Sequence, residues 1–421
     1  MSTADVATIL LIVVTEGAVA LFVVAAGVGL GQAWLRALRL HNRPRRWQIA
    51  LAAGFGLPTL SLLMLALGSA GLLSRALWIV LLTVGAAAGV VGVMRMPRPG
   101  APPARRSRWL WIGAVPFAAL ALAAATCPPG YLWPTEGNGY DALEYHLGLP
   151  HEWWSAGRVA PLPHNLYSYL PANAEMLYLL SFVVRGAPLA GLYAAQLLNV
   201  AWAGLAVAAA WLMAAELEPR AGPAAALLMA SCPFVVYLCG VAYVECGLLA
   251  TATLALACLV RGVRTEPATA LRWAIASGLL AGLACGFKLT AGPLLVLPLA
   301  VAWALQPGRR GRRLVLFGLA AAATLAPWAI RNTATTGNPL FPLARGLFAE
   351  RAGLWSDEAA ARFAEGHRPD PAMRSAAARG AAAWRNVVCG ELFGRAAWLL
   401  AALGLLWHRR SDRRLAVARR R

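Results

Sequence analysis

Long runs of apolar residues, separated by short polar segments, dominate the pattern of the chain. Many of these runs reach the length of about 20 residues that a helix needs to cross a hydrocarbon core of about 30 Å. The pattern predicts membrane-spanning helices over 5–30, 48–70, 73–94, 109–126, 188–214, 221–240, 241–262, 268–287, 289–306, 313–331 and 394–408. A shorter apolar run, 175–185, predicts an interfacial or re-entrant helix. We therefore expect an all-α polytopic membrane protein with about 11 transmembrane helices, within a range of about 10–12.

The composition agrees with this pattern and excludes an ordinary soluble domain. Hydrophobic residues make up 60% of the chain and charged residues only 13%, whereas soluble domains contain about 25% charged residues. The formal net charge of +20 comes almost wholly from arginine clusters between apolar runs. That placement indicates orientation in a membrane and attraction to anionic lipid, not binding of nucleic acid. We expect membrane lipids as partners and no nucleic acid.

The arginine clusters predict how the chain is threaded. They lie at 36–46, 95–108, 309–313 and 409–421. The positive-inside rule assigns all of them to the cytoplasmic side, so the N-terminus is outside, the C-terminus is cytoplasmic, and the protein is a multi-pass protein of the cell's inner (cytoplasmic) membrane. Five regions follow: four N-terminal helices (1–126), a first external loop (127–187), a helical core (188–331), a second external segment (332–393), and a last helix with a basic tail (394–421).

The first external loop gathers acidic and imidazole side chains within 137–154, in a chain that otherwise has few acids. Asp141 and Glu144 are three residues apart, the spacing of a capping box, in which Asp141 caps a short helix that Pro150 ends. This structural interpretation does not exclude catalysis. A second short helix is expected over 151–156, and its two tryptophans are typical of an interfacial belt.

The loop then carries a fuller motif. Asp-Ala-Leu-Glu-Tyr-His over 141–146, followed by Leu-Pro-His-Asn-Leu-Tyr-Ser-Tyr-Leu-Pro over 162–171, resembles the first external loop of bacterial GT-C fold glycosyltransferases. These are polytopic enzymes related to protein O-mannosyltransferases and aminoarabinose lipid A transferases. The resemblance covers about 127–345. Later motifs strengthen it: Ala-Tyr-Val-Glu at 242–245, Gly-Leu-Ala-Cys-Gly-Phe-Lys-Leu-Thr at 282–290, and Pro-Trp-Ala-Ile-Arg-Asn at 327–332.

The resemblance implies a GT-C-like fold and a defined activity. It implies a glycosyltransferase that moves a sugar from a polyprenyl-phosphate-linked donor to a lipid, glycan or protein acceptor at the outer face of the cytoplasmic membrane, with inversion. The loop carboxylate that acts as general base in the family maps onto Asp141. This sequence departs from the family twice. Its acidic loop follows the fourth span instead of the first, and Glu245 stands where the family more often has Asp, which leaves the role of Glu245 open.

The chemistry also needs cations, because the departing phosphate gathers negative charge beside lipid. Lys288, which is the only lysine in the chain, and Arg331 are the candidates for donor phosphate binding. The alternative for both is snorkelling at the outer interface. Glu245 has three interpretations: an ion pair with Lys288, orientation of the acceptor, or a divalent-cation site shared with Asp141. No metal is assigned.

The remaining polar and aromatic residues of these motifs are candidates for substrate binding. For each of them, an ordinary structural role such as a hydrogen bond or loop packing is the alternative. The set is Glu144, His146, His164, Asn165, Tyr167, Tyr169 and Asn332.

Three rival functions stay open at this stage: an O-antigen ligase or polymerase-type envelope enzyme, a transporter, and a non-catalytic envelope assembly protein. A transporter should show discontinuous helices and ionisable groups near the membrane midplane, whereas here the titratable residues gather at outer ends and loops. The sequence leaves the sugar, the acceptor and the oligomeric state open.

Overall fold

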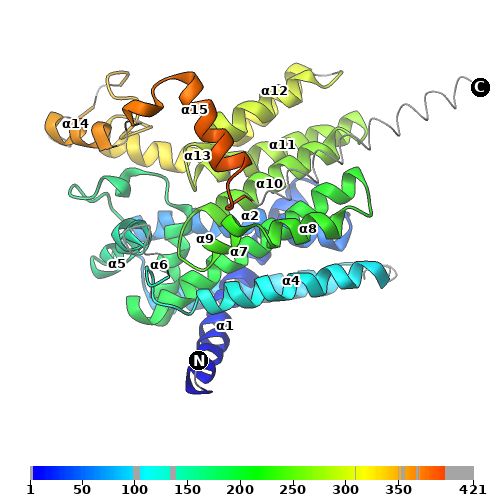
Figure 1. Cartoon of the computed structure of the whole chain (residues 1–421), viewed down its shortest axis with the longest axis horizontal. Coiled ribbons are helices and arrows are strands. Elements are labelled where there is room, and N and C mark those ends of the chain that lie inside the picture. Colours follow the sequence, from blue (N-terminus) through cyan, green and yellow to red (C-terminus); the bar gives the residue numbers. More distant parts are fainter. Residues whose placement is uncertain are drawn as a thin grey trace, which may run out of the picture.

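Helices make up the regular structure of the chain, and the part that the structure describes contains no strand (Figure 1). This computed structural model describes residues 3–97, 105–132, 139–308, 310–348, 350–351, 356–366, 368 and 370–393. Within these residues, seven helices are long and apolar enough to cross a membrane. They are α1 (Thr3–Ala37), α2 (Arg45–Ser69), α3 (Arg75–Arg95), α7 (Pro188–Leu217), α10 (Glu245–Gly262), α11 (Pro267–Cys285) and α13 (Arg310–Thr336).

An eighth span is present if two bent helices count as one. α8 (Gly222–Ala230) and α9 (Pro233–Cys239) meet at an angle of 58°. The chain is therefore a polytopic all-α protein with seven or eight candidate spans, and the expected count of about 11 is not confirmed. The helix predicted over 394–408 and the tail that follows lie outside the described residues.

One predicted span is shorter than expected. α12 (Leu297–Leu305) extends to Gly292–Leu305 only through a π-helical turn. A helix of 14 residues is about 21 Å long, less than the hydrocarbon thickness of about 30 Å, so by length it does not cross a bilayer alone. α4 (Arg105–Ala124) has 20 residues, and its described apolar part is Ile112–Ala124.

Proline and glycine set several helix limits. α7, α9 and α11 each begin at a proline. Proline lacks the backbone N–H, and at the first position of a helix this N–H would have no hydrogen-bond partner within the helix. α6 (Asn173–Arg185) ends at Gly186, whose φ of 77° is the left-handed conformation that glycine adopts without strain. The break between α8 and α9 also falls just before a proline, Pro233.

The apolar run at 175–185 does not lie on a lipid surface. It forms α6, in which every residue from Asn173 to Val184 is buried. This helix packs against α2, α5 (Gly148–Ser155) and α7 inside the bundle. The sequence of α6 is mostly apolar, and its polar residues Asn173, Glu175 and Ser181 are buried as well, whereas an interfacial helix needs one polar face toward water. The interfacial interpretation was therefore wrong.

Small residues bring the first two helices into close contact. A side chain on Gly31 would meet the Ala52 carbonyl oxygen at 1.8 Å, and one on Gly56 would meet the Gly27 carbonyl oxygen at 1.7 Å. Helices that cannot use the hydrophobic effect against lipid associate through such close backbone approach. α1 and α2 are therefore tightly joined, although the N-terminal part of α1 projects from the bundle (Figure 1).

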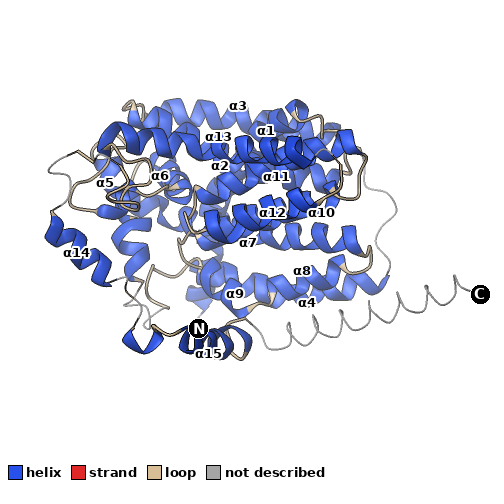
Figure 2. Cartoon of the chain, turned by 90° about the horizontal axis from the view of Figure 1, so that it is seen from above, coloured by secondary structure: helices blue, strands red, loops and turns tan. Residues whose placement is uncertain are grey.

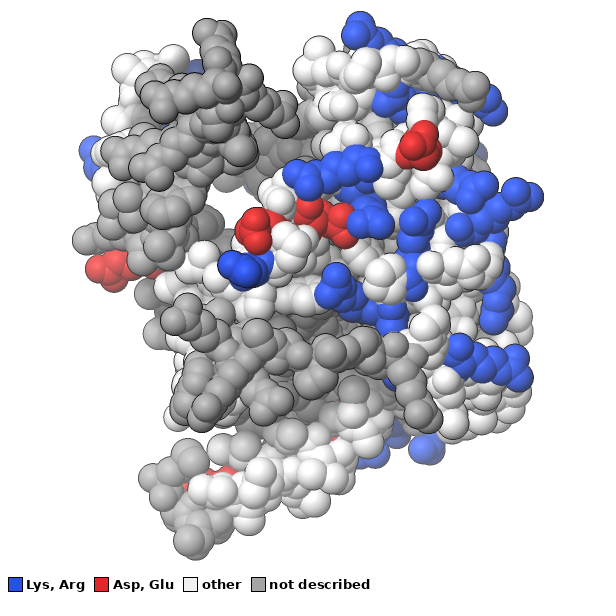
Figure 3. All heavy atoms as spheres, turned by 90° about the vertical axis from the view of Figure 1, so that its right-hand side faces the viewer, with Lys and Arg blue, Asp and Glu red and all other residues white. Residues whose placement is uncertain are grey.

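The long helices run in similar directions, and α5, α6 and α14 (Asp357–Gly366) gather at one end of them (Figures 1 and 2). Basic side chains gather at the opposite end (Figure 3). There Arg261 pairs with Glu216 at 2.6 Å, and the Trp47 and Trp273 rings lie 5.3 Å apart. The arginine-rich end and the end that carries α5 and α6 are thus separated along the bundle.

Candidate functional site

The acidic and basic candidates Glu245 and Lys288 form an ion pair. Glu245 is the first residue of α10, and Lys288 follows the end of α11 at Cys285. Lys288 Nζ lies 2.8 Å from Glu245 Oε1, and 48% of the lysine side chain is exposed. Among the described atoms, Glu245 Oε2 is buried without a hydrogen-bond partner. The ion pair, one of the three interpretations of Glu245 from sequence, is present, and the ammonium group, which has three donors, retains capacity for an anionic ligand.

Asp141 lies at the start of an irregular helical turn. Helical structure begins at Tyr140 and continues as the π-helical turn η2 (Ala142–His146). The Asp141 side chain makes no capping hydrogen bond; its carboxylate is exposed and accepts a hydrogen bond from Tyr145. The expected capping box is wrong because Asp141 itself has helical backbone angles, φ −59° and ψ −39°, whereas a capping residue needs an extended conformation.

Two further expectations about this loop are corrected. Pro150 does not end the helical turn at Asp141, since it lies in the first turn of α5, where proline is tolerated. Trp153 is not part of an interfacial belt. It is fully buried, and its Nε1 donates to the Ala160 carbonyl at 2.7 Å, so it joins α5 to the chain that follows this helix.

His146 belongs to a buried pair that the sequence did not predict. Its Nδ1 lies 2.6 Å from Glu175 Oε1, and both side chains are 5% exposed. The imidazole also contacts the Tyr243 ring, at 5.2 Å between centroids. Glu175 lies in the first turn of α6. The available signal was an acid in an otherwise apolar helix, which needs a partner when it is buried.

Two tyrosines line the side of this cluster on which Asp141 lies. The Tyr145 and Tyr167 rings stack at 4.2 Å with an angle of 15°. Burial raises the pKa of the Tyr145 phenol, and the charges of Asp141, Glu175 and Glu245 raise it further. Burial and Asp141 likewise raise the pKa of Tyr167. Tyr145 therefore stays protonated and donating, and it lies within electrostatic reach of all three carboxylates.

The other loop candidates have structural partners. Asn165 is buried; its side chain accepts from the Tyr167 amide and donates to the Glu144 carbonyl at 3.2 Å. Glu144 is exposed. His164 lies in an exposed pair with Glu152, 2.9 Å apart. Asn165 thus fixes the two halves of the loop to each other, whereas His164 lies in a separate, solvated contact.

Arg331 and Asn332, near the end of α13, hydrogen-bond to the chain around Tyr169 and Phe341. Asn332 donates to the carbonyls of Tyr169 and Phe341, at 2.9 and 3.2 Å, and its Oδ1 accepts from Arg331. Arg331 also donates to the Tyr169 carbonyl at 2.6 Å and covers the Trp328 ring at 4.8 Å. One nitrogen, Arg331 Nη1, is buried without a partner among the described residues. The phosphate role of Arg331 stays a prediction.

The cluster can be traced from contact to contact. Asp141 accepts a hydrogen bond from Tyr145, and the charges of Glu175 and Glu245 act on the Tyr145 phenol. Glu245 in turn holds Lys288. The loop after α4 and the ends of α6, α10 and α11 thus place one exposed carboxylate and one half-exposed cation in the same neighbourhood, with a buried His146–Glu175 pair beside them.

A metal centre has no matching residues in this neighbourhood. The described part of the chain contains no group of three or more His, Cys, Asp or Glu side chains that could hold an ion. Glu245 uses one oxygen for Lys288. The residues therefore do not fit the divalent-cation site considered from sequence, and no chemical step is assigned to a metal.

These features define the class of the protein: a multi-pass helical membrane protein with a cluster of titratable residues at one end. A family profile described as a domain of unknown function (DUF8201) matches residues 250–349. No curated protein and no solved structure matches the chain. The matched segment contains Lys288 and Arg331 but begins after Asp141 and Glu245.

Proposed function

We propose that this protein is an integral membrane glycosyltransferase that moves a sugar from a polyprenyl-phosphate-linked donor to an acceptor hydroxyl at the outer face of the cytoplasmic membrane. One observation carries the proposal. Asp141 presents an exposed carboxylate that is not used as a helix cap, is oriented by Tyr145, and shares a neighbourhood with the Glu245–Lys288 pair. A base and a cation in one neighbourhood are what transfer from a lipid phosphate requires.

The proposed reaction is a single displacement. The acceptor oxygen attacks the anomeric carbon of the sugar while the bond from that carbon to the phosphate oxygen breaks. Asp141 takes the proton of the acceptor hydroxyl, and the polyprenyl phosphate leaves with the bonding electrons. Attack opposite to the leaving group inverts the anomeric centre. A positioned general base contributes about 10²–10⁴-fold to such a step.

Lys288 is the residue proposed to meet the leaving phosphate. Its ammonium group is half exposed and held at one point by Glu245, so a phosphate can bind the remaining donors without displacing the lysine. Glu245 then acts as the partner that aims the ammonium. Arg331 is a second candidate through Nη1, which has no partner among the described residues, although its Nη2 bonds the carbonyls of Tyr169 and Leu170 and its Nε bonds Asn332.

The decisive experiment compares wild type with Asp141→Asn, using purified full-length protein and a panel of radiolabelled polyprenyl-phosphate sugars. We expect transfer to fall about 10²–10⁴-fold, because the amide cannot accept the proton. Glu152→Gln is the matched control: it also neutralises an exposed loop carboxylate, which pairs with His164 outside the cluster. If Asp141→Asn transfers sugar as fast as Glu152→Gln, Asp141 is not the base.

A second experiment tests the side of the membrane. Asp141→Cys in intact cells should react with an impermeant thiol reagent above the background of the wild-type cysteines. Labelling only after the cells are permeabilised would place the loop in the cytoplasm and would overturn the outward-facing proposal.

No observation favours transport over transfer. The one broken span among the described helices, α8 with α9, contains no Asp, Glu, Lys, Arg or His. In transporters, by contrast, interrupted helices surround charged substrates and coupling ions.

A further inference from the structure

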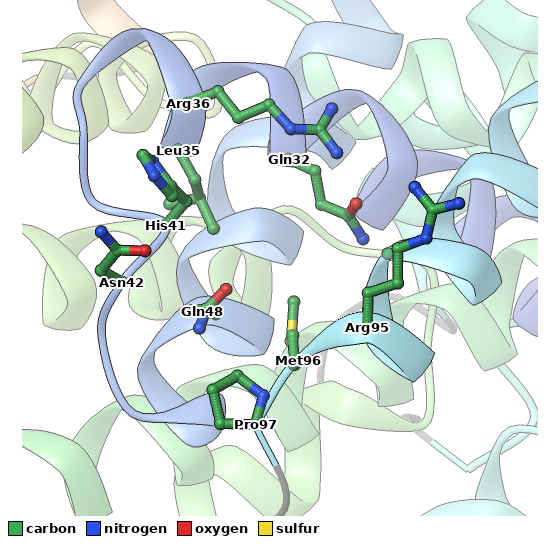
Figure 4. Close-up of a pocket in the computed structure, with 10 residues that line it drawn as sticks. Gln32, Leu35, Arg36, His41, Asn42, Gln48, Arg95, Met96 and Pro97 are labelled. Carbon is green, nitrogen blue, oxygen red and sulfur yellow. The ribbon is translucent and has the colours of Figure 1, made fainter.

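A cavity of about 430 Å³ opens at the arginine-rich end, far from Asp141. It lies between the C-terminal ends of α1 and α3 and the loop that leads into α2. Its polar lining consists of Gln32, Arg36, His41, Asn42, Gln48 and Arg95. Figure 4 shows the Gln32 amide between the guanidinium groups of Arg36 and Arg95. No residue that lines the cavity is an aspartate or a glutamate.

The two arginines of this cavity, unlike Arg261 but like Arg39 and Arg220 at the same end, have no ion pair with any described carboxylate. Arg261 pairs with Glu216 at 2.6 Å. Two guanidinium groups beside one cavity repel each other unless an anion lies between them. The charge of the cavity therefore calls for an anionic ligand.

The walls of the cavity are held in place by the fold. Gln32 and Gln48 are each 5% exposed. Gln32 Nε2 donates to the Gly89 carbonyl at 3.1 Å, and Gln48 Nε2 donates to the Arg43 carbonyl at 2.6 Å. Both amides are thereby fixed, so that the three helices present a preformed site that does not have to be assembled on binding.

An apolar edge adjoins these polar groups. Leu35 and Met96 line the cavity and are buried, and they lie at the ends of two candidate spans, α1 and α3. A free inorganic anion would use only the guanidinium groups, whereas a phospholipid would also place its glycerol and the first carbons of its chains against this edge.

We propose that the cavity binds the phosphodiester headgroup of an anionic phospholipid. Arginine forms paired, charge-assisted hydrogen bonds to phosphate oxygens. Basic pockets between transmembrane helices at an arginine-rich membrane face are suited to such headgroups. His41 and Asn42 supply further hydrogen-bonding groups for the headgroup hydroxyls. The site is independent of the proposed glycosyl transfer and gives the three N-terminal helices a role of their own.

The test is native mass spectrometry of the full-length protein in detergent, titrated separately with short-chain phosphatidylglycerol, phosphatidylcholine and inorganic phosphate. We expect a saturable phosphatidylglycerol adduct and weaker binding of phosphatidylcholine. Arg36→Gln with Arg95→Gln should weaken the adduct about thirtyfold, since each basic residue near a membrane surface contributes to affinity by several-fold. Replacing both residues by lysine should restore part of the binding, because the charge returns.

The matched control removes the same charge from the same end outside the cavity, through Arg39→Gln with Arg220→Gln. Both of these arginines are exposed and neither lines the cavity. Equal weakening by the two glutamine pairs would show attraction to the surface in general and would overturn the site. Displacement of phosphatidylglycerol by an equal concentration of inorganic phosphate would overturn the lipid as ligand. If the Arg36/Arg95 glutamine pair fails to fold, the lysine pair decides: phosphatidylglycerol binding no stronger than phosphatidylcholine binding overturns the proposal.

Discussion

Replacement of Asn173 tests whether the site end of the protein is built as the structure shows. Asn173 is 1% exposed and begins α6. Its Nδ2 donates to the Leu283 carbonyl at 3.1 Å, and its Oδ1 accepts from Trp328 Nε1 at 3.0 Å. Its backbone carbonyl accepts from Ser61 Oγ at 2.6 Å. One side chain thus joins α6 to α11 and α13, and Glu175 lies two residues further on.

The expected loss of stability follows from the groups that lose their hydrogen bonds when Asn173 is replaced. Asn173→Ala leaves the Leu283 carbonyl and the Trp328 N–H unpaired, and each buried unsatisfied group costs about 1–3 kcal/mol. We therefore expect the free energy of unfolding to fall by about 2–5 kcal/mol. Trp328→Phe removes a single bond and should cost about 1–3 kcal/mol. The two changes should be coupled by about 0.5–1.5 kcal/mol, because they share that bond.

The assay is unfolding of the purified protein in mixed micelles with increasing denaturing detergent, for both single variants and the double variant. Trp303→Phe is the matched control, since Trp303 is fully buried and its Nε1 has no hydrogen-bond partner in the part of the chain that the structure describes. It should cost less than Trp328→Phe. Additive effects of Asn173→Ala and Trp328→Phe, or equal costs for the two tryptophan replacements, would refute the hydrogen bond on which the estimate rests.

Three further predictions concern the cluster itself. Lys288→Met should raise the KM for the lipid-linked donor in a transfer assay. It should change the free energy of unfolding by no more than about 1 kcal/mol, the usual limit for an exposed ion pair. Equal losses of donor binding and of folding would mean that the pair is purely structural. Glu175→Ala should lower the free energy of unfolding by about 3–5 kcal/mol, because it leaves the buried His146 without its partner. Adding His146→Phe should recover part of this loss. If the double variant is no more stable than Glu175→Ala, the two residues are not a coupled pair. Tyr145→Phe should lower kcat at saturating donor without loss of stability, since Asp141 loses its donor; an unchanged kcat would exclude that positioning role.

Much of the fold could be predicted from the pattern of apolar runs. The pattern located α1, α2, α3, α7, α10, α11 and α13 closely, because a membrane imposes a minimum length on each apolar run. It did not resolve elements that protein encloses. α6 is apolar because it is buried in the bundle, and hydropathy cannot tell burial in protein from contact with lipid. The break between α8 and α9 likewise depends on local backbone geometry near Pro233, inside a run that reads as one span.

The sequence suggested residues for the candidate site and, as one interpretation, the Glu245–Lys288 ion pair, but it did not suggest the other contacts. Asp141 and Glu245 were assigned through the resemblance to GT-C fold glycosyltransferases, and Lys288 stood out as the only lysine of the chain, between apolar runs where a cation is costly. The spacing of Asp141 and Glu144 indicated a capping box, yet the π-helical turn rotates these side chains differently from an α-helix. The Glu175 and Tyr145 contacts join positions that are distant in sequence or lie on an irregular turn. No local pattern specifies them.

The position of Asp141 on a loop raises the question of how such a carboxylate is held well enough for catalysis, which needs a geometry fixed within about 0.5 Å. Buried asparagines supply the answer. Asn165 ties the two halves of the loop together, Asn173 ties the following helix to two others, and Asn332 ties Tyr169 to the second external segment. Each amide pairs with backbone carbonyls that a lipid environment would leave unsatisfied, so breaking any one of them is costly. These hydrogen bonds join the described part of the loop to the helices around it, which is what the proposed role of Asp141 requires.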